Sequence, residues 1–239
     1  MSTLVLENVP PAPRRPIAPL WHTLSLLLLF LGMAAWGAIL QHRVAAHASA
    51  MPRPSSVLPL YLSLMAMEWG LVLYVVKGGL RRSGTSMAAI VNARGGARAI
   101  ATDVLIALAT WGLWTAIVYA WDRVQGPGHA ASVGTLLPHR PLEIVTWIAL
   151  SITAGFAEEL VFRGYLQRQF QAWTGSLGVA VALQAILFGV SHGYQGVRAC
   201  ARITLYGLLF GILAARRGSL RPGVIAHAWT DIASGVFRI

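Results

Sequence analysis

Long apolar stretches dominate this chain, and the longest of them hold at most one charged residue each. A helix needs roughly 20 consecutive apolar residues to cross about 30 Å of hydrocarbon. The apolar stretches run from Leu20 to Leu40, Val57 to Val76, Ile100 to Ala120, Leu142 to Ala157, Leu177 to Ser191, Ile203 to Ala215 and Val224 to Val236. The first three are the clearest, and the others are shorter or interrupted by a polar residue. The pattern predicts an all-α fold, a polytopic transmembrane bundle of about seven helices.

The segments between these stretches divide the chain into three parts. Residues 1 to 18 are rich in proline, which cannot hold a helix, and predict an extended or disordered tail. The tail is followed by N-terminal helices and loops (19–141) and a C-terminal core (142–239), with connecting loops at 41–56 and 121–141. A cleaved signal peptide is the alternative for the first apolar stretch. That stretch exceeds the roughly 7 to 15 residues of a signal sequence, so we interpret it as the first helix.

Composition supports a membrane protein and gives it an orientation. Hydrophobic residues make up 56% of the chain and charged residues 11%, whereas soluble domains carry about a quarter charged residues. The net charge of +11 could suggest nucleic acid, but the basic residues stand at helix ends rather than on one soluble domain, so we expect no nucleic-acid partner. With a cytoplasmic N-terminus, 12 of the 19 basic residues lie on the inner side. The positive-inside rule therefore predicts that the N-terminus and the Lys77–Arg98 loop are cytoplasmic.

Five of the eight acidic residues fall within or beside apolar helices: Glu68, Asp103, Glu158, Glu159 and Asp231. An acid or arginine at mid-helix costs about 2.5 to 3.5 kcal/mol on insertion scales. Such groups must satisfy one another inside the bundle. Intramembrane charges of this kind predict a functional site.

The segment from Glu158 to Arg163 holds the densest charge. On a helix Glu159 and Arg163 are four residues apart, share a face and can form an ion pair. Glu158 is rotated by about 100° from Glu159 and has no cation of its own on the helix. Glu158 is therefore the candidate general base for activating water. The alternative is that both acids are ion-paired at a membrane interface.

Two further elements stand on later helices. Phe188 and His192 are four residues apart near the end of an apolar helix that Gly193 can terminate. His192 can position a catalytic water, although a lone histidine of this kind is more often structural. His227 and Asp231, on the last helix, are again four apart and predict a shared inward face.

The order Glu-Glu-x-x-x-Arg, Phe-x-x-x-His, His-x-x-x-Asp on successive membrane helices resembles the CPBP family, the relatives of CAAX-type prenyl proteases. The resemblance covers residues 142 to 239. It implies a metal-independent glutamic intramembrane endopeptidase of the bacterial inner membrane, without a cofactor and opening toward the cytoplasm. Its partners would be the lipid bilayer and a membrane-associated protein or peptide substrate. Glu158 and His192 would activate water, and Glu159 and Arg163 would organise the first carboxylate.

The resemblance also implies that His227 and residue 231 stabilise the oxyanion. CAAX proteases have asparagine at that last position, whereas this chain has Asp231. An ionised carboxylate accepts hydrogen bonds but cannot donate one. We therefore expect either a protonated Asp231 or, preferably, an Asp231 that orients His227 and leaves the imidazole as the donor.

Three other functions fit parts of the pattern. A zinc peptidase could use His192, His227 and a glutamate, but the chain lacks His-Glu-x-x-His, and its lone Cys200 argues against a thiolate site. A non-catalytic immunity or partner protein could keep the same fold and charges. A transporter would couple ions to intramembrane charges, yet the sequence shows no paired, interrupted helices in two halves.

Overall fold

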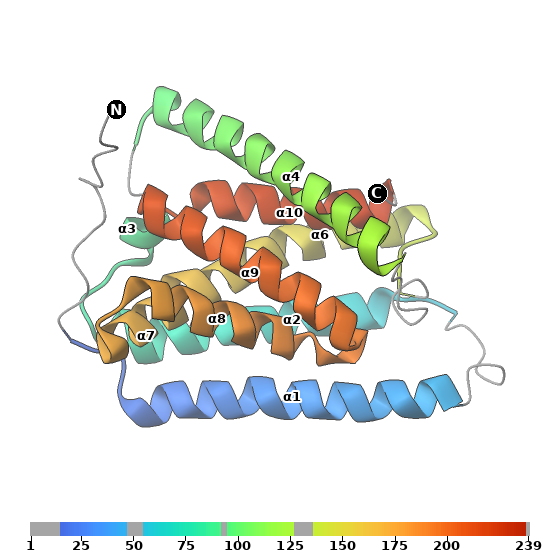
Figure 1. Cartoon of the computed structure of the whole chain (residues 1–239), viewed down its shortest axis with the longest axis horizontal. Helices are drawn as coiled ribbons and strands as arrows, with labels where there is room; N and C mark the ends of the chain where they lie inside the picture. The colour runs from blue at the N-terminus through green and yellow to red at the C-terminus, as the bar shows by residue number, and fades with distance from the viewer. Residues whose placement is uncertain (1–14, 47–54, 92–94, 127–135, 238–239) are drawn as a thin grey trace.

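The computed structural model describes residues 15–46, 55–91, 95–126 and 136–237, and over these residues every regular element is helical (Figure 1). The all-α prediction is confirmed. The helices are α1 (Leu20–Ala46), α2 (Leu58–Val75), α3 (Met87–Val91), α4 (Ala97–Gln125), α6 (Pro141–Glu158), α7 (Gln167–Thr174), α8 (Leu177–Ser191), α9 (Val197–Arg217) and α10 (Arg221–Val236). Two π-helical segments, η1 (Val76–Leu80) and η2 (Glu159–Leu166), and one 3₁₀ turn, η3 (Gly193–Gln195), join them.

Five helices in the described part of the chain are long and apolar enough to cross a membrane, and the chain is an integral membrane protein. They are Leu20–Leu40, Leu58–Leu80, Ala97–Gln125, Pro141–Thr174 and Val197–Arg217. All seven predicted stretches lie in helices, but some boundaries were wrong. The fourth stretch continues unbroken through η2 and α7, and α4 runs to Gln125, so Asp122 is helical rather than in a loop.

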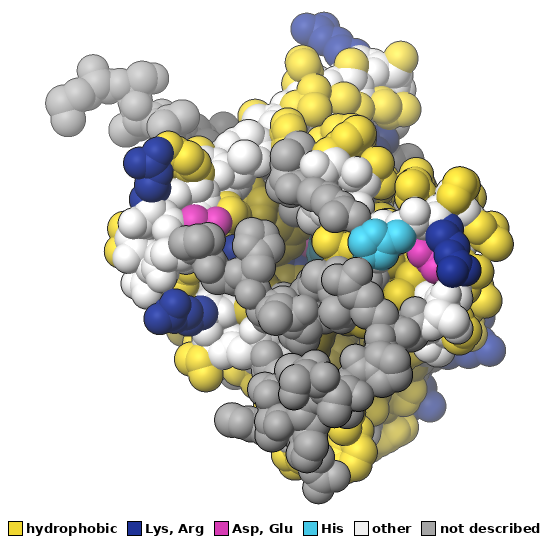
Figure 2. Space-filling view, turned by 90° about the vertical axis from the view of Figure 1, so that its right-hand side faces the viewer, with side chains coloured by type: hydrophobic (Ala, Val, Ile, Leu, Met, Phe, Trp, Pro, Cys, Tyr) yellow, Lys and Arg dark blue, Asp and Glu magenta, His cyan; other side chains and the backbone are white. Residues whose placement is uncertain are grey.

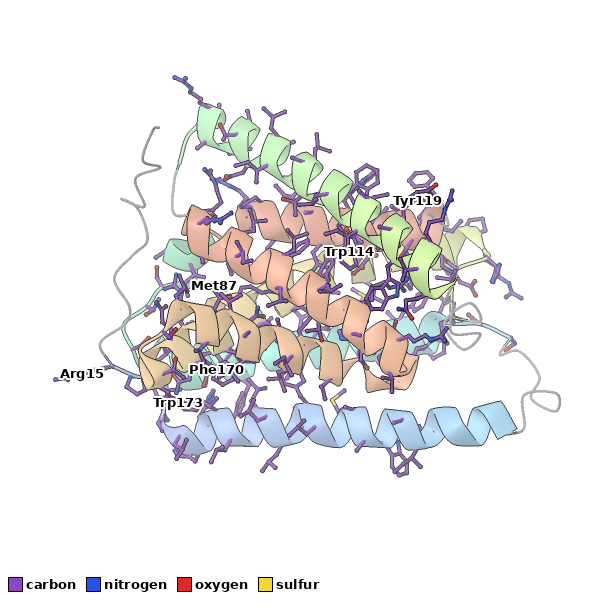
Figure 3. All side chains as sticks on the ribbon, viewed as in Figure 1. Arg15, Met87, Trp114, Tyr119, Phe170 and Trp173 are labelled. Carbon is purple, nitrogen blue, oxygen red and sulfur yellow. The ribbon has the colours of Figure 1, made fainter. Side chains whose placement is uncertain are left out.

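The helix formed by α6, η2 and α7 lies at the centre of the bundle, while α1 and α4 lie on opposite sides of it (Figure 1). In the most apolar stretch of this central helix, half of the residues are buried inside the protein. On α4, by contrast, Trp114 is buried while Leu105 and Tyr119 face outward (Figure 3). Lipid would cover such outward apolar side chains, which explains why the outer helices are apolar all round.

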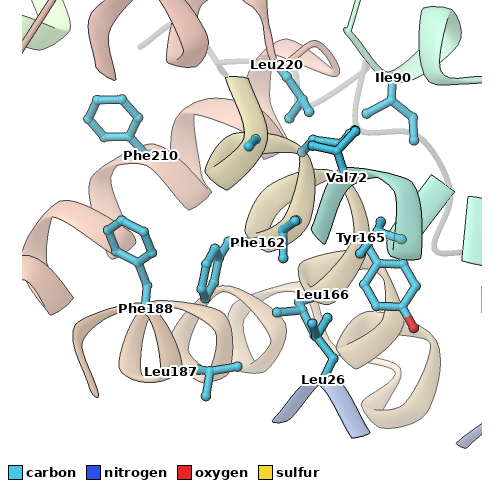
Figure 4. Packing of buried hydrophobic residues seen from close by; sticks show 14 of the residues in the cluster. Leu26, Val72, Ile90, Phe162, Tyr165, Leu166, Leu187, Phe188, Phe210 and Leu220 are labelled. Atoms are coloured by element: carbon cyan, nitrogen blue, oxygen red, sulfur yellow. The ribbon is translucent and has the colours of Figure 1, made fainter. Parts of the chain in front are cut away.

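Aromatic side chains fill the core beside the central helix. Phe162 from η2 packs against Phe188 from α8, with ring centroids 4.8 Å apart, and against Phe30 from α1. Figure 4 shows Phe162 and Phe188 close together, with Phe210 of α9 beyond them. This packing fixes the central helix against α8 and α9.

Two glycines let helices approach closely. A Cβ at Gly155 would lie 2.7 Å from the backbone nitrogen of Ala228, so only glycine lets α6 and α10 meet here. A Cβ at Gly207 would lie 2.8 Å from the Cα of Ala185, so this small residue lets α9 pack closely against α8. The contact at Gly155 brings α10 against the segment that carries Glu158.

The end of α8 differs from the expectation. Gly193 does not terminate the helix with a left-handed residue, because α8 ends at Ser191 and the chain continues into the 3₁₀ turn η3. The positive φ of 89° falls on Gly196 instead. A Cβ at Gly193 would lie 3.1 Å from the carbonyl oxygen of Ala34, so this glycine serves the packing of η3 on α1.

Most of the predicted tail, residues 1–14, lies outside the described residues. The last part of the tail is anchored rather than free. The side-chain oxygen of Gln169 accepts hydrogen bonds from the backbone N–H groups of Ile17 (2.7 Å) and Ala18 (3.1 Å), and its amide donates to the Ala18 carbonyl (2.8 Å). Buried backbone groups need such partners, so the segment before α1 is fixed to α7.

The two ends of the bundle differ. η1, α3 and the start of α4 lie at one end, together with the turn between α9 and α10 (Figure 1). The starts of α6 and α9 and the end of α4 lie at the other end, which Figure 2 shows with basic side chains spaced around its rim. We call these the Lys77 end and the His192 end, because η1 begins beside Lys77 and His192 follows the last residue of α8.

Candidate functional site

Glu159 is the centre of a fully buried charge cluster. Its Oε1 lies 3.1 Å from Nη1 of Arg163 and 3.0 Å from Nδ1 of His227. The side chains of Glu159 and Arg163 have no solvent exposure, and that of His227 is 5% exposed. A carboxylate only accepts hydrogen bonds, so Nδ1 of His227 carries a proton and donates it to Glu159. The ion pair expected from the spacing of Glu159 and Arg163 is present, and His227 joins it.

The helix at this point is not the regular α-helix that the sequence analysis assumed. α6 ends at Glu158, and a π-helical segment begins at Glu159. Such segments are rare and often occur at functional sites. Instead of diverging, the two adjacent glutamates both reach His227, with Glu159 on one ring nitrogen and Glu158 on the other. The wider helical turn brings both carboxylates to one imidazole.

The second nitrogen of His227 faces a more accessible group of acids. Its Nε2 lies 3.5 Å from Oε2 of Glu158 and 3.7 Å from Oδ2 of Asp231. These two side chains are 22% and 35% exposed, in contrast to the enclosed Glu159. His227 therefore separates a closed interior, where the ion pair lies, from the partly exposed acids Glu158 and Asp231.

Aromatic rings surround the buried cations. The guanidinium carbon of Arg163 lies 4.4 Å from the centre of the Phe188 ring and 5.7 Å from that of Phe210. The ring of Tyr206 lies 5.1 Å from that of His227, in edge-to-face geometry. Cations are attracted to aromatic faces, and these rings also exclude water. The sequence analysis noted Phe188 only as the residue four positions before His192. In the structure its ring packs against the guanidinium group of Arg163.

His192 is separated from the cluster by the ring of Phe188, which contacts both His192 and His227. Its Nδ1 lies 2.8 Å from the Phe188 carbonyl oxygen, which can only accept, so Nδ1 carries the proton. In the neutral ring Nε2 then keeps its lone pair. The His192 ring lies 4.9 Å from Phe188 and 6.0 Å from Tyr194, and Phe188 in turn contacts His227. The structure thus brings five of the six predicted site residues into direct contact and leaves His192 beside them.

Glu68 also belongs to this region. The sequence analysis named it among the intramembrane acids but did not assign it to the site. It is a buried residue of α2 and interacts electrostatically with Glu158, His227 and Asp231. The sequence held one signal for it. The positions four residues away, Leu64 and Val72, are apolar, so Glu68 has no partner on its own helix and must find one elsewhere.

Asp103, in contrast, is a structural anchor. Its carboxylate lies 2.5 Å from Nη2 of Arg217 and 2.6 Å from Nε of Arg221. Its side chain is 1% exposed. The two arginines compensate the buried charge of Asp103. The same ion pairs attach α4 to the turn between α9 and α10. The intramembrane acids therefore divide into one anchor and one cluster of four.

A metal ion bound by the protein would need several His, Cys, Asp or Glu ligands grouped together. Among the described residues, no three His, Cys, Asp or Glu side chains are grouped so that they could hold a metal ion. The cluster contains Arg163, whose positive charge would repel a divalent cation.

Comparison with known proteins finds a family model similar to the part of the chain that holds these residues. Residues 140–233 match the family model described as type II CAAX prenyl endopeptidase Rce1-like. The match runs from the residue before α6 into α10, so it contains all six predicted site residues but not Glu68. No curated protein and no solved structure matches the chain.

Proposed function

Because residues 140–233 form a domain of the Rce1-like type II CAAX prenyl endopeptidase family, we propose that this protein is a glutamic intramembrane endopeptidase. It would hydrolyse a peptide bond in a membrane-associated protein or peptide by means of a water activated by Glu158. The observation that carries the proposal is the arrangement around His227, with a buried ion pair on one nitrogen and accessible carboxylates on the other.

Glu158 is the better placed of the two glutamates to act as general base. Glu159 is enclosed and already occupied by Arg163 and His227. Glu158 is partly exposed, and its nearest charged partner is His227 at 3.5 Å. A general base needs a free lone pair within reach of water, and Glu158 meets that condition. Glu159 and Arg163 would hold His227 in position.

His192 would assist in placing the water. The hydrogen bond from its Nδ1 to the Phe188 carbonyl fixes the ring and leaves Nε2 as an acceptor. His192 and Glu158 come from different helices, α8 and α6, so a water between them would be held from two sides. The proton of the attacking water would pass to Glu158.

His227 would stabilise the oxyanion through Nε2. Glu159 already accepts the hydrogen bond of Nδ1, so the ring is oriented by Glu159 as well as by the Asp231 that the sequence analysis proposed for this role. With both nitrogens protonated, His227 can donate a hydrogen bond from Nε2 to the oxyanion on the side of Glu158 and Asp231. Asp231 and Glu158, at 3.7 and 3.5 Å from that nitrogen, favour the protonated ring because they are acids.

A direct test compares the protein termini of membranes that contain the wild-type protein, lack it, or contain the Glu158→Ala variant. We expect new N-termini in one or a few membrane-associated proteins that depend on the wild-type protein and are absent with the variant. Asp122→Asn, which alters an acid on α4 paired with Arg202 at 3.6 Å, is the matched control and should leave the cleavage intact. Identical termini in all samples would favour the non-catalytic alternative.

The structure also connects the orientation of the protein to the side from which the site is reached. Glu158 and Asp231 are partly exposed, while Glu159 and Arg163 are enclosed. The basic Lys77–Arg98 loop lies at the Lys77 end, where a cavity lined by Thr85, Ile90 and Ser219 reaches Arg163. We retain the charge asymmetry because it is a property of this chain, and propose that the loop is cytoplasmic and that the site is reached from the cytoplasmic side.

Cysteine labelling in intact cells tests this orientation. On a Cys200→Ala background, Val197→Cys at the His192 end should react with an impermeant reagent added outside, and Ser83→Cys should not. Val197 is 87% exposed and Ser83 is exposed, so both positions are accessible. Labelling of Ser83→Cys alone would reverse the topology and move the opening to the outer side.

A further inference from the structure

Glu68 lies outside the matched domain, yet it is buried beside the same cluster of acids. The residue is 7% exposed, and its Oε2 has no hydrogen-bond partner among the described residues. An ionised carboxylate buried without a partner is strongly disfavoured, whereas the neutral acid has a proton to donate. A group in this situation needs a ligand that accepts a hydrogen bond.

The packing of α2 on α6 places Glu68 level with Glu158. The Trp69 ring of α2 contacts the Phe156 ring of α6, with centroids 5.9 Å apart. These aromatic residues are the close chain neighbours of Glu68 and Glu158. The charges near Glu68 agree with this placement, since they belong to Glu158 of α6 and to His227 and Asp231 of α10.

Other titratable groups lie near the cluster at the His192 end. The His192 ring lies 4.9 Å from that of Phe188 and 6.0 Å from that of Tyr194. Helices α2, α6 and α10 each bring a carboxyl group to the cluster itself, and Glu68 is the contribution of α2.

The charges of the cluster do not balance if every acid is ionised. Four carboxyl groups, those of Glu68, Glu158, Glu159 and Asp231, face two cations. Arg163 and the Nδ1 of His227 both contact Glu159. Among the described residues, Nε2 of His227 is therefore the one cationic partner left for the other three acids. Neighbouring carboxyl groups in a low-dielectric site hold a proton between them, as in paired-acid enzymes.

We propose that Glu68 is a second catalytic carboxyl group of the peptidase, protonated at rest, which donates its proton to the carbonyl oxygen of the scissile bond while Glu158 takes one from water. The inference rests on the proposed function and places Glu68 on the side of His227 that faces the substrate. Asp231 is better placed than Glu68 to stay ionised, because its side chain is 35% exposed and lies 3.7 Å from His227.

The protons balance over the cycle. The water oxygen forms a bond to the carbonyl carbon and one water proton passes to Glu158. The carbonyl oxygen, whose developing negative charge accepts the Nε2–H hydrogen bond of His227, receives the Glu68 proton. The resulting diol then collapses, the C–N bond breaks, and the leaving nitrogen takes the proton held by Glu158. One hydroxyl proton of the diol returns to Glu68, so the products are a carboxylic acid and an amine, and both glutamates regain their starting states.

Two measurements on the purified full-length protein test the proposal. Infrared spectroscopy of the wild-type protein at neutral pH should show a carboxylic-acid C=O band that shifts in D₂O, and Glu68→Gln should lack this band while Asp122→Asn retains it. In peptide cleavage, Glu68→Gln should lower kcat by about 100- to 1000-fold with a small change in KM, as for loss of a transition-state donor. Glu68→Asp, which keeps the acid, should recover part of the rate.

The outcomes separate this inference from the proposed function. A band unchanged in Glu68→Gln, or wild-type turnover by that variant, would overturn the role of Glu68 while leaving the peptidase intact. A Glu68→Asp variant no faster than Glu68→Gln would likewise indicate a purely structural residue. If the wild-type protein cleaves nothing, the proposed function fails and the donation step with it, and the infrared band alone still reports whether Glu68 holds the proton.

Discussion

Replacing Glu158 by glutamine is expected to abolish peptide cleavage while leaving a folded protein in the membrane. The carboxamide has nearly the same size but cannot accept a proton from water, and a lost general base costs about 100- to 10,000-fold in rate. Stability should change little, because Glu158 is partly exposed and His227 keeps its hydrogen bond to Glu159. Cleavage of a substrate identified from membrane termini, together with thermal unfolding in detergent, measures both effects.

The neighbouring histidines extend this prediction. His192→Ala should resemble Glu158→Gln, because both remove a group that handles water. His227→Ala should leave residual turnover, since loss of one oxyanion donor costs about 100- to 1000-fold in rate. Cleavage by Glu158→Gln at close to the wild-type rate would contradict the assignment of the base. If Glu159→Gln were also fully active, the protease proposal itself would have to be abandoned.

Glu159→Gln should act mainly on stability. Glu159 and Arg163 are both fully buried and lie 3.1 Å apart. Removing one partner of a buried pair leaves the other charge uncompensated, which costs about 3 to 5 kcal/mol of unfolding free energy. The aromatic rings beneath Arg163 offset part of that loss but cannot replace a carboxylate. Denaturant unfolding in detergent should therefore show a much lower midpoint for Glu159→Gln than for Glu158→Gln.

A double variant makes this prediction specific. Glu159→Gln with Arg163→Met removes both charges, so no ion remains stranded, and the double variant should be more stable than Glu159→Gln alone. Its activity should still be low, because His227 loses the partner of its Nδ1. A Glu159→Gln protein within about 1 kcal/mol of the wild type would show that the pair is not a buried structural charge pair of the usual strength.

The pair of Glu159 and Arg163 shows what local pattern can predict. Four residues along a helix bring side chains to one face, and the ion pair follows from that spacing even though the helix here is π-helical. The π-helical turn itself was not predictable, because no residue between Glu159 and Leu166 signals an extra residue in the turn. As a result the sequence placed Glu158 away from Glu159, whereas both reach His227.

The sequence by itself determined the membrane helices and pointed to most of the candidate site residues. Apolar stretches of about 20 residues have no other stable environment, and charges within them need internal partners. Only the tertiary structure decided which charges share a site. Asp103 and Glu68 look alike in the sequence, each an acid in an apolar helix, yet one is paired with Arg217 and Arg221 and the other lies by Glu158. Their partners lie far along the chain, and the contacts depend on the depth and rotation at which whole helices pack, which no local period encodes.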